Sequence, residues 1–316
     1  MRFKNALRLI FENFGCIYKI LVYRIIVMII LVSLIAALIM PNILMIINST
    51  QLDYIFILFK DFLKSILNGT VTGVYGEQFK NAFAAFYDFV RLKSGRIILS
   101  GFLLLAIFMV GRFLNGLSNF AMGGMINDHM SSLSHLGFIQ ALIRDIKSAC
   151  IFQLAYVVIS LVYDTLVIII CYNILFGLFG LFGLFAIFLA STAFVALIAI
   201  KLTFLSSIMP AMIADKMKLI PAVKSSLKMN KKQWSRLFAT YAASVFLIMY
   251  INITMTIATF LSSILITIPL SLLLIICIQF VTYYTIHDKK YFINYDNIII
   301  PKNLREDEKL LEDIDI

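Results

Sequence analysis

The chain has 316 residues, of which 62% are apolar and 14% are charged, with a mean hydropathy of +0.97 and a formal net charge of +10. A soluble globular domain is about 45–50% apolar with about a quarter of its residues charged, so this chain has too few polar side chains to cover a core in water. Composition therefore excludes a soluble globular protein and predicts an integral membrane protein whose excess apolar surface faces lipid.

Six apolar runs are long enough to be transmembrane helices. A bilayer core of about 30 Å requires about 20 apolar residues in a helix, and the runs lack the polar–apolar alternation of barrel strands. The sequence thus predicts an all-α fold, a polytopic membrane helix bundle that forms one domain over residues 1–286, followed by a polar cytoplasmic tail at 287–316. The predicted spans are 25–47, 97–114, 151–172, 175–200, 237–261 and 264–284.

Basic residues gather before the first span, between spans four and five (starting at Lys201) and after span six. An excess of Lys and Arg marks cytoplasmic loops. An N-terminus inside places all three clusters on the cytoplasmic side, and six spans return the C-terminus to that side. We expect a multi-pass protein of the plasma membrane whose positive charge faces lipid rather than nucleic acid. Its richness in Ile, Lys and Asn points to a bacterial origin.

A short amphipathic segment precedes spans one, three and five. In each, an alanine is followed by an aliphatic residue, at Ala6, Ala141 and Ala222. Apolar side chains recur there at the helical period, and the basic flanks suit a helix at the membrane interface. The sequence predicts a unit of one cytoplasmic amphipathic helix and one transmembrane hairpin, used three times. The alternative is that any interfacial helix leading into a span has this pattern.

The segment 48–96 is the large outer connection. It has two helical stripes of aromatic and aliphatic residues around a Gly- and Thr-rich loop at 68–76. These two helices could cap the bundle or lie on the outer leaflet. Tight turns are expected at 173–177 and 262–263, and the mixed charge of 305–316 allows a partly helical cytoplasmic segment.

Asp164 is the ionisable residue that stands out inside a predicted span. An Asp at the centre of a span costs about 2.5–3.5 kcal/mol, and such residues usually face a bundle interior or a water-filled cavity. One interpretation is a proton, cation or substrate site. The other is an Asp nearer the outer boundary that hydrogen-bonds a neighbouring helix.

His129 and His135 share the second predicted cytoplasmic loop with Asp128. A zinc site needs three or four ligands in a fixed geometry, so these residues are predicted to be solvated, and no metal or cofactor is expected. Motifs of nucleotide-binding and hydrolytic enzymes are absent from the sequence. A lipid-modifying enzyme would need the three residues to converge with other loops. The four cysteines lie in or near spans, where we expect buried free thiols.

Residues 206–234 read SSIMPAMIADKMKLIPAVKSSLKMNKKQW. This stretch resembles the cytoplasmic segment of the bacterial membrane domain found fused to glycerophosphodiester phosphodiesterases, and of its uncharacterised stand-alone relatives, which share a six-span layout. The chain has no catalytic phosphodiesterase domain, so the resemblance implies a family without a settled activity. The positions that carry the resemblance are Pro210, Asp215, Ala222, Ser225 or Ser226, Leu227 and Trp234.

We expect a non-enzymatic scaffold, accessory or assembly component that engages anionic inner-leaflet lipid, together with a protein partner or a second copy of itself. Each basic residue near an anionic membrane surface contributes about 1 kcal/mol. The alternative is a small transporter or permease that uses Asp164 as an intramembrane coupling or substrate site. The predicted lipid-interface anchors are Lys218, Lys224, Lys228, Lys231, Lys232 and Trp234.

Overall fold

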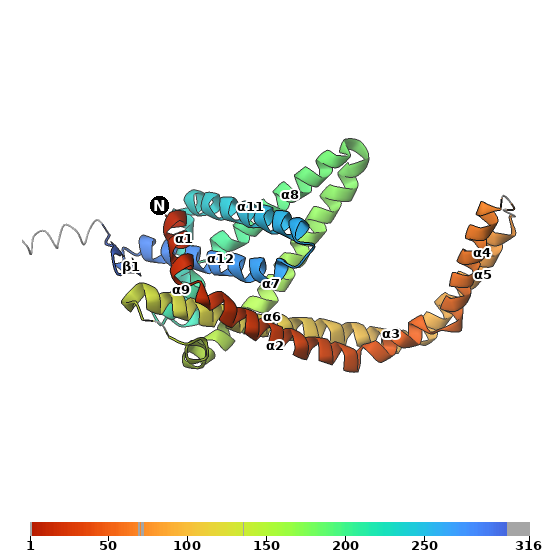
Figure 1. Cartoon of the computed structure of the whole chain (residues 1–316), viewed down its shortest axis with the longest axis horizontal. Helices are drawn as coiled ribbons and strands as arrows, with labels where there is room; N and C mark the ends of the chain where they lie inside the picture. Colours follow the sequence, from red (N-terminus) through yellow and green to blue (C-terminus); the bar gives the residue numbers. More distant parts are fainter. Residues whose placement is uncertain (1, 69, 71–72, 135, 302–316) are drawn as a thin grey trace, which may run out of the picture. The chain divides into compact units, whose positions relative to one another are not determined.

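The computed structural model describes residues 2–68, 70, 73–134 and 136–301, and it is almost entirely helical (Figure 1). Among these residues, six helices are long and apolar enough to cross a membrane, which confirms the predicted all-α, multi-pass bundle. In chain order the elements are α1 (Arg2–Glu12), α2 (Gly15–Leu38), α3 (Met40–Ile47), α4 (Thr50–Leu67), α5 (Val74–Leu92), α6 (Ser94–Ser132), α7 (Phe138–Phe182), α8 (Leu184–Leu205), α9 (Ile208–Ala214), α10 (Leu219–Lys232), α11 (Trp234–Ala258), α12 (Ile264–Ile286), β1 (Tyr291–Asn294) and β2 (Asn297–Ile299).

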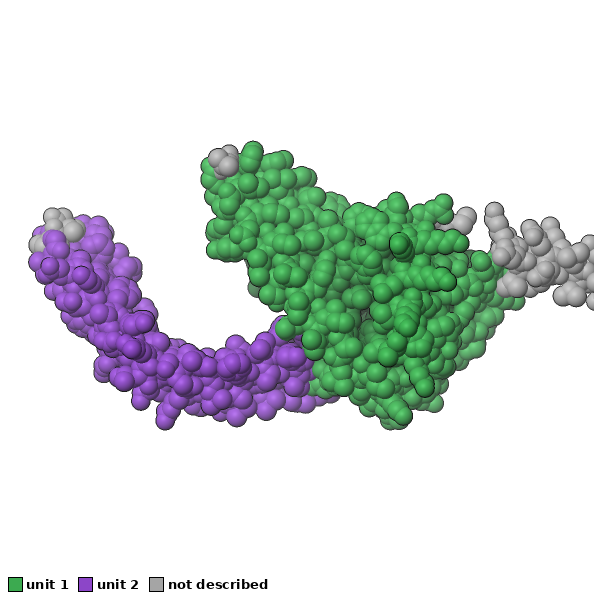
Figure 2. Space-filling view, turned by 180° about the vertical axis from the view of Figure 1, so that it is seen from behind, with its two compact units in different colours: residues 1–25, 113–316 green, residues 26–112 purple. Residues whose placement is uncertain are grey.

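The chain forms two compact units (Figure 2). Unit 1 comprises residues 1–25 and 113–316, and unit 2 comprises residues 26–112. The single membrane domain predicted over residues 1–286 therefore contains all of unit 2 and most of unit 1.

Unit 2 contains the helices of the predicted outer segment. α4 and α5 pack against each other, and the Phe62 ring lies 5.5 Å from that of Tyr75 and 5.9 Å from that of Phe79, measured between centroids. The two predicted helical stripes are confirmed. α3 and α4 are bent by 48° relative to each other, and together they are long and apolar enough to be a broken span or a re-entrant loop, which the sequence interpretation did not consider.

The first span differs from the predicted range 25–47, because the candidate span is α2, which ends at Leu38. Pro41 lies in the first turn of the next helix, α3. Proline has no N–H to donate, and its ring clashes with the carbonyl four residues earlier, so a helix does not continue through it undisturbed. The prediction followed hydropathy alone and ran past this break.

The turn between α7 and α8 also differs from its predicted position at 173–177. α7 continues through that stretch, and the chain reverses at Gly183, whose φ of 54° and ψ of −129° lie in a region that favours glycine. α7 is likewise continuous with the amphipathic segment that precedes the predicted third span, so this segment is not a separate helix.

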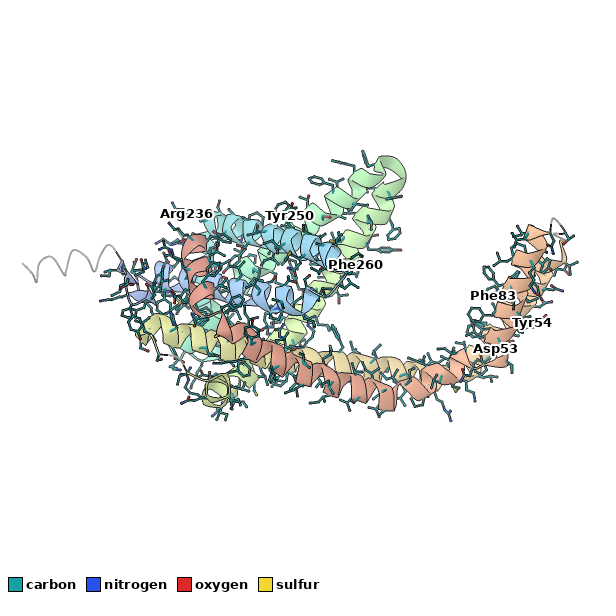
Figure 3. All side chains as sticks on the ribbon, in the orientation of Figure 1. Asp53, Tyr54, Phe83, Arg236, Tyr250 and Phe260 are labelled. Carbon is teal, nitrogen blue, oxygen red and sulfur yellow. The ribbon has the colours of Figure 1, made fainter. Side chains whose placement is uncertain are left out.

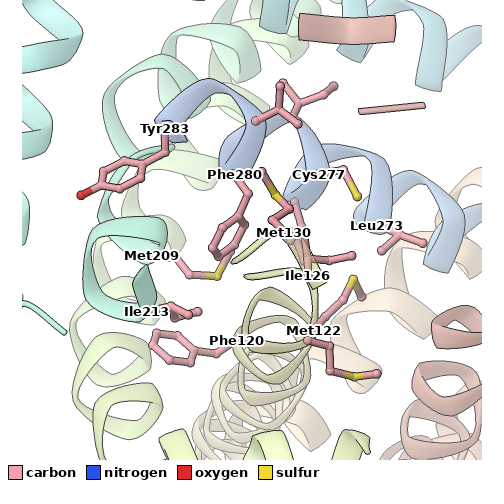
Figure 4. Close-up of a cluster of buried hydrophobic side chains, with 14 of the residues drawn as sticks. Phe120, Met122, Ile126, Met130, Met209, Ile213, Leu273, Cys277, Phe280 and Tyr283 are labelled. Atoms are coloured by element: carbon pink, nitrogen blue, oxygen red, sulfur yellow. The ribbon is translucent and has the colours of Figure 1, made fainter. Parts of the chain in front are cut away.

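The core of unit 1 forms around the C-terminal half of α12, which is the most buried of the candidate spans. Phe280 of α12 is buried with Ile126 of α6 and Met209 of α9 (Figure 4). The antiparallel hairpin β1–β2 closes this core, because Tyr291 and Ile293 are 2% and 1% exposed. Residues 291–299 fall in the predicted polar tail, but they are a folded part of unit 1. Residues 305–316 lie outside the described residues.

Candidate functional site

An ion pair, whose lysine is buried and whose aspartate side chain is 26% exposed, joins the two helices of the α7–α8 hairpin. Lys201 of α8 donates from Nζ to Asp164 Oδ1 at 2.6 Å and to Ser160 Oγ at 2.5 Å, and Ser160 Oγ lies 3.1 Å from the second carboxylate oxygen of Asp164. Ser160 is fully buried and Lys201 is 9% exposed. The three side chains form a polar triangle inside two candidate spans.

Two tyrosines surround this triangle. The Nζ atom of Lys201 lies 5.6 Å from the centroid of the Tyr156 ring and 5.9 Å from that of the Tyr163 ring, within the range of a cation–π interaction. The Tyr163 hydroxyl donates to the Leu197 carbonyl at 2.7 Å. Residues three and four apart share a face of a helix, and α7 carries the tyrosines, Ser160 and Asp164 at this spacing.

The placement of Lys201 corrects the prediction that it begins a basic cytoplasmic loop. The lysine lies in α8, inside the candidate span Phe185–Ala214. The apolar run continues beyond it, and its ammonium is neutralised by Asp164. The second interpretation of Asp164 included a hydrogen bond to a neighbouring helix, and the structure contains this hydrogen bond. In the sequence, its partner Lys201 was visible only as a single lysine between two apolar runs.

The basic surface predicted for lipid contact lies on α10, whose inner face is attached to the end of α8. Asn230 Nδ2 donates to the Thr203 carbonyl at 2.7 Å, and Ser207 Oγ donates to Asn230 Oδ1 at 2.9 Å. The last carbonyls of a helix have no partner within that helix, so Asn230 satisfies groups that α8 leaves open. Ala222 and Ser226 complete this buried face.

The outer face of α10 carries the predicted anchors. Lys218, which precedes the helix, and the four lysines within it are all exposed. Trp234 begins α11, is 37% exposed, and its ring is stacked on that of Phe238 at 5.1 Å. Arg236, labelled in Figure 3, is the third residue of α11 and is also exposed. The lysines within the helix are Lys224, Lys228, Lys231 and Lys232.

Asp215, directly after α9, is held by groups at the end of α12. It accepts a hydrogen bond from the Tyr283 hydroxyl at 2.5 Å and forms an ion pair with Lys289. Burial alone would raise the pKa of Asp215. The hydrogen bonds from Lys289 and Tyr283, with the charges of Lys289 and His287, outweigh burial and hold the pKa below its ordinary value. This contact spans more than sixty residues of sequence, and no local pattern indicated it.

A second ionic cluster joins α6 to α7. Arg144 donates to Asp128 and to Asp145, each at 2.8 Å, and Lys216 lies 3.5 Å from Asp145. The prediction that Asp128 and His129 are solvated loop residues is wrong, because both lie in α6 and His129 is 3% exposed. The Nε2 atom of His129 lies 2.8 Å from the Ile293 carbonyl. His135 lies outside the described residues.

The structure brings out an internal similarity that the sequence interpretation missed. After each even-numbered predicted span, the chain carries the same four-residue pattern. It consists of isoleucine, any residue, aspartate, and lysine or histidine. The three predicted alanines of the amphipathic segments are also each 0% exposed. Both observations favour a threefold repeat over a pattern shared by any interfacial helix. The matching segments are 126–129, 213–216 and 286–289, and the alanines are Ala6, Ala141 and Ala222.

Comparison of the chain with models of protein families, with curated proteins and with solved structures gives no match. The resemblance of residues 206–234 to a phosphodiesterase-linked membrane domain stays a prediction. Fold and contacts define the class of protein, which is a multi-pass helical membrane protein.

Proposed function

We propose that the chain is a non-enzymatic membrane component, a scaffold, accessory or assembly factor, that engages anionic lipid through the outer face of α10. The supporting observation is the two-sided character of this helix. Asn230 attaches its inner face to α8, while its lysines point to the exposed side. In this proposal both termini are cytoplasmic, α10 faces the inner leaflet of the plasma membrane, and a protein partner or a second copy binds elsewhere on the bundle.

The magnitude of the electrostatic attraction supports the proposal. Each lysine near an anionic membrane surface contributes about 1 kcal/mol. The four lysines of α10 lie on a helix that is already folded against the bundle, and Lys218 directly precedes it, so no segment has to be ordered before they meet lipid. Trp side chains favour the membrane–water interface, and Trp234 follows these lysines at the start of α11.

Trp234 is the single tryptophan of the chain and reports on this surface without a label. The protein is reconstituted in equimolar anionic and zwitterionic phospholipid, with bromine on the acyl chains of either the anionic or the zwitterionic lipid. Bromine quenches tryptophan on close approach. We expect stronger quenching when the anionic lipid carries the bromine, and loss of the difference in K224Q/K228Q/K232Q.

The matched control removes three lysines from unit 2, in the variant K60Q/K64Q/K80Q. These side chains are also exposed, and the change in net charge is the same. The control should quench as the wild type does. Equal quenching by both brominated lipids in the wild type would contradict the proposal.

The second candidate function is a small transporter that uses Asp164. The supporting observation is the pairing of Asp164 with Lys201 within two candidate spans, since paired ionisable residues inside spans often mark ion and substrate paths. In this candidate, a proton or cation replaces Lys201 at the carboxylate during transport. Single cysteines placed across residues 160–168, after replacement of the four native cysteines, test it. Labelling of the Asp164 face by an impermeant thiol reagent supports transport, whereas labelling of the span ends alone opposes it.

A further inference from the structure

We propose that a groove between α7, α9 and the start of α10 binds one anionic phospholipid molecule. The groove has a volume of about 470 Å³, within the range of about 300–1,000 Å³ that is typical of ligand sites. All of its lining residues belong to unit 1. Those that carry the argument are Lys147, Lys216, Lys218, Ile151, Met212 and Leu219.

Three lysines from three segments give the groove its charge. Lys147 lies in α7, Lys216 follows α9, and Lys218 directly precedes α10. Among the residues that the structure describes, the carboxylate within ion-pair distance of these ammonium groups is that of Asp145, 3.5 Å from Lys216. The Lys216 side chain is 66% exposed, and exposed ion pairs are weak. Asp145 is also bound by Arg144 at 2.8 Å, so the groove keeps a net positive charge.

Apart from the lysines, most residues that line the groove are apolar. Ile151, Met212 and Leu219 line it beside the lysines. Ile151 also begins an exposed apolar stripe along α7, which continues through Leu154 and Val158. Lysines beside apolar side chains fit a phosphate headgroup with its acyl chains along α7. The positive charge selects an anionic lipid, because the phosphate of a zwitterionic lipid is neutralised by its own ammonium group.

A larger groove of about 1010 Å³ lies between the start of α2 and the start of α7, but its charge is different. It is lined by Lys19 and Arg144. Arg144 is neutralised by Asp128 and Asp145, so Lys19 is the basic lining residue that has no ion pair with any residue that the structure describes. Charge therefore assigns the anionic lipid to the smaller groove.

The inference rests on the proposed orientation of α10 toward an anionic leaflet, but it adds one lipid held at defined residues. The full chain is purified in mild detergent, equimolar anionic and zwitterionic phospholipids are added, and native mass spectrometry counts the lipids retained per chain. We expect one anionic phospholipid on the wild type. The variant K147Q/K216Q/K218Q should retain it about 100-fold less tightly, because three basic contacts are lost.

The matched control is K224Q/K228Q/K232Q, which removes the same charge from the outer face of α10. It should keep the bound lipid while it loses the preference of Trp234 for anionic lipid in bilayers. The inference is overturned if the wild type retains no phospholipid, if it retains zwitterionic lipid as often, or if both variants lose the lipid equally. Failure of the leaflet proposal is distinct, because the Trp234 preference would be absent while the groove lipid remained.

Discussion

Lys201 and Asp164 form an ion pair at 2.6 Å between α8 and α7, inside two helices that are each apolar enough to span a membrane. Removing one partner of a buried pair leaves an uncompensated charge, which costs about 3–5 kcal/mol, while replacing both partners by apolar residues is often neutral. The pair therefore makes the α7–α8 hairpin dependent on both residues together.

The substitution D164N should lower the free energy of unfolding by about 3–5 kcal/mol, because the Lys201 ammonium loses its counter-charge. The double variant D164L/K201M should recover most of this loss. Unfolding in detergent, followed by circular dichroism with increasing denaturant, measures both. T165A, a change at an exposed neighbour in α7, is the control. An unfolding free energy of D164N equal to that of the wild type would show that the pair does not stabilise the hairpin.

Substitution of Asn230 should release α10 from the end of α8. N230A removes the hydrogen bond to the Thr203 carbonyl and leaves buried groups unsatisfied, at a cost of about 1–3 kcal/mol. Amide hydrogen exchange over residues 219–232 should become faster. K228A, on the exposed face of the same helix, should leave the exchange rates unchanged. Unchanged exchange in N230A would mean that other contacts hold the helix.

Stability should depend on acid through Asp215. Its pKa is lower in the folded protein than its ordinary value of 3.8, so its contribution to stability is complete above that value and is lost as pH falls through the folded pKa. D215N should remove this part of the pH dependence, measured as unfolding free energy between neutral and strongly acidic pH. D53N, a change at an exposed carboxylate of α4 labelled in Figure 3, should retain it. An acid dependence identical in D215N and wild type would contradict the prediction.

Two glycines of the α7–α8 hairpin should respond in opposite directions to alanine. G183A places a side chain at a φ of 54° and should cost about 1–3 kcal/mol. Gly180 lies in α7, where an added Cβ meets no atom within 4 Å, so G180A should raise stability by up to about 1 kcal/mol through helix propensity. Thermal unfolding of the two variants distinguishes them, and an equal response from both would contradict the turn at Gly183.

Hydropathy predicted the number of candidate spans well, because a bilayer-length apolar run needs little tertiary context. It did not predict where helices break. Pro41 ended the first span early, and Gly183 formed a turn that had been expected at 173–177. Both positions depend on backbone geometry rather than on apolar content.

The candidate site was only partly predictable, because its contacts join distant segments. Asp164 was visible as a charge within an apolar run, and the lysines of α10 were visible as a cluster. Lys201 was assigned to a loop because a charge was taken as the end of a span, and its pairing needed the α7–α8 hairpin. The contact of Asp215 with Tyr283 and Lys289 had no local signal, since packing of α9 against α12 creates it.

The most direct test of the central claim is the quenching of Trp234 fluorescence by brominated lipid in equimolar anionic and zwitterionic bilayers. The account predicts that bromine on the anionic lipid quenches more strongly, and that K224Q/K228Q/K232Q loses this preference while K60Q/K64Q/K80Q keeps it. Equal quenching by the two lipids in the wild-type protein would contradict the account.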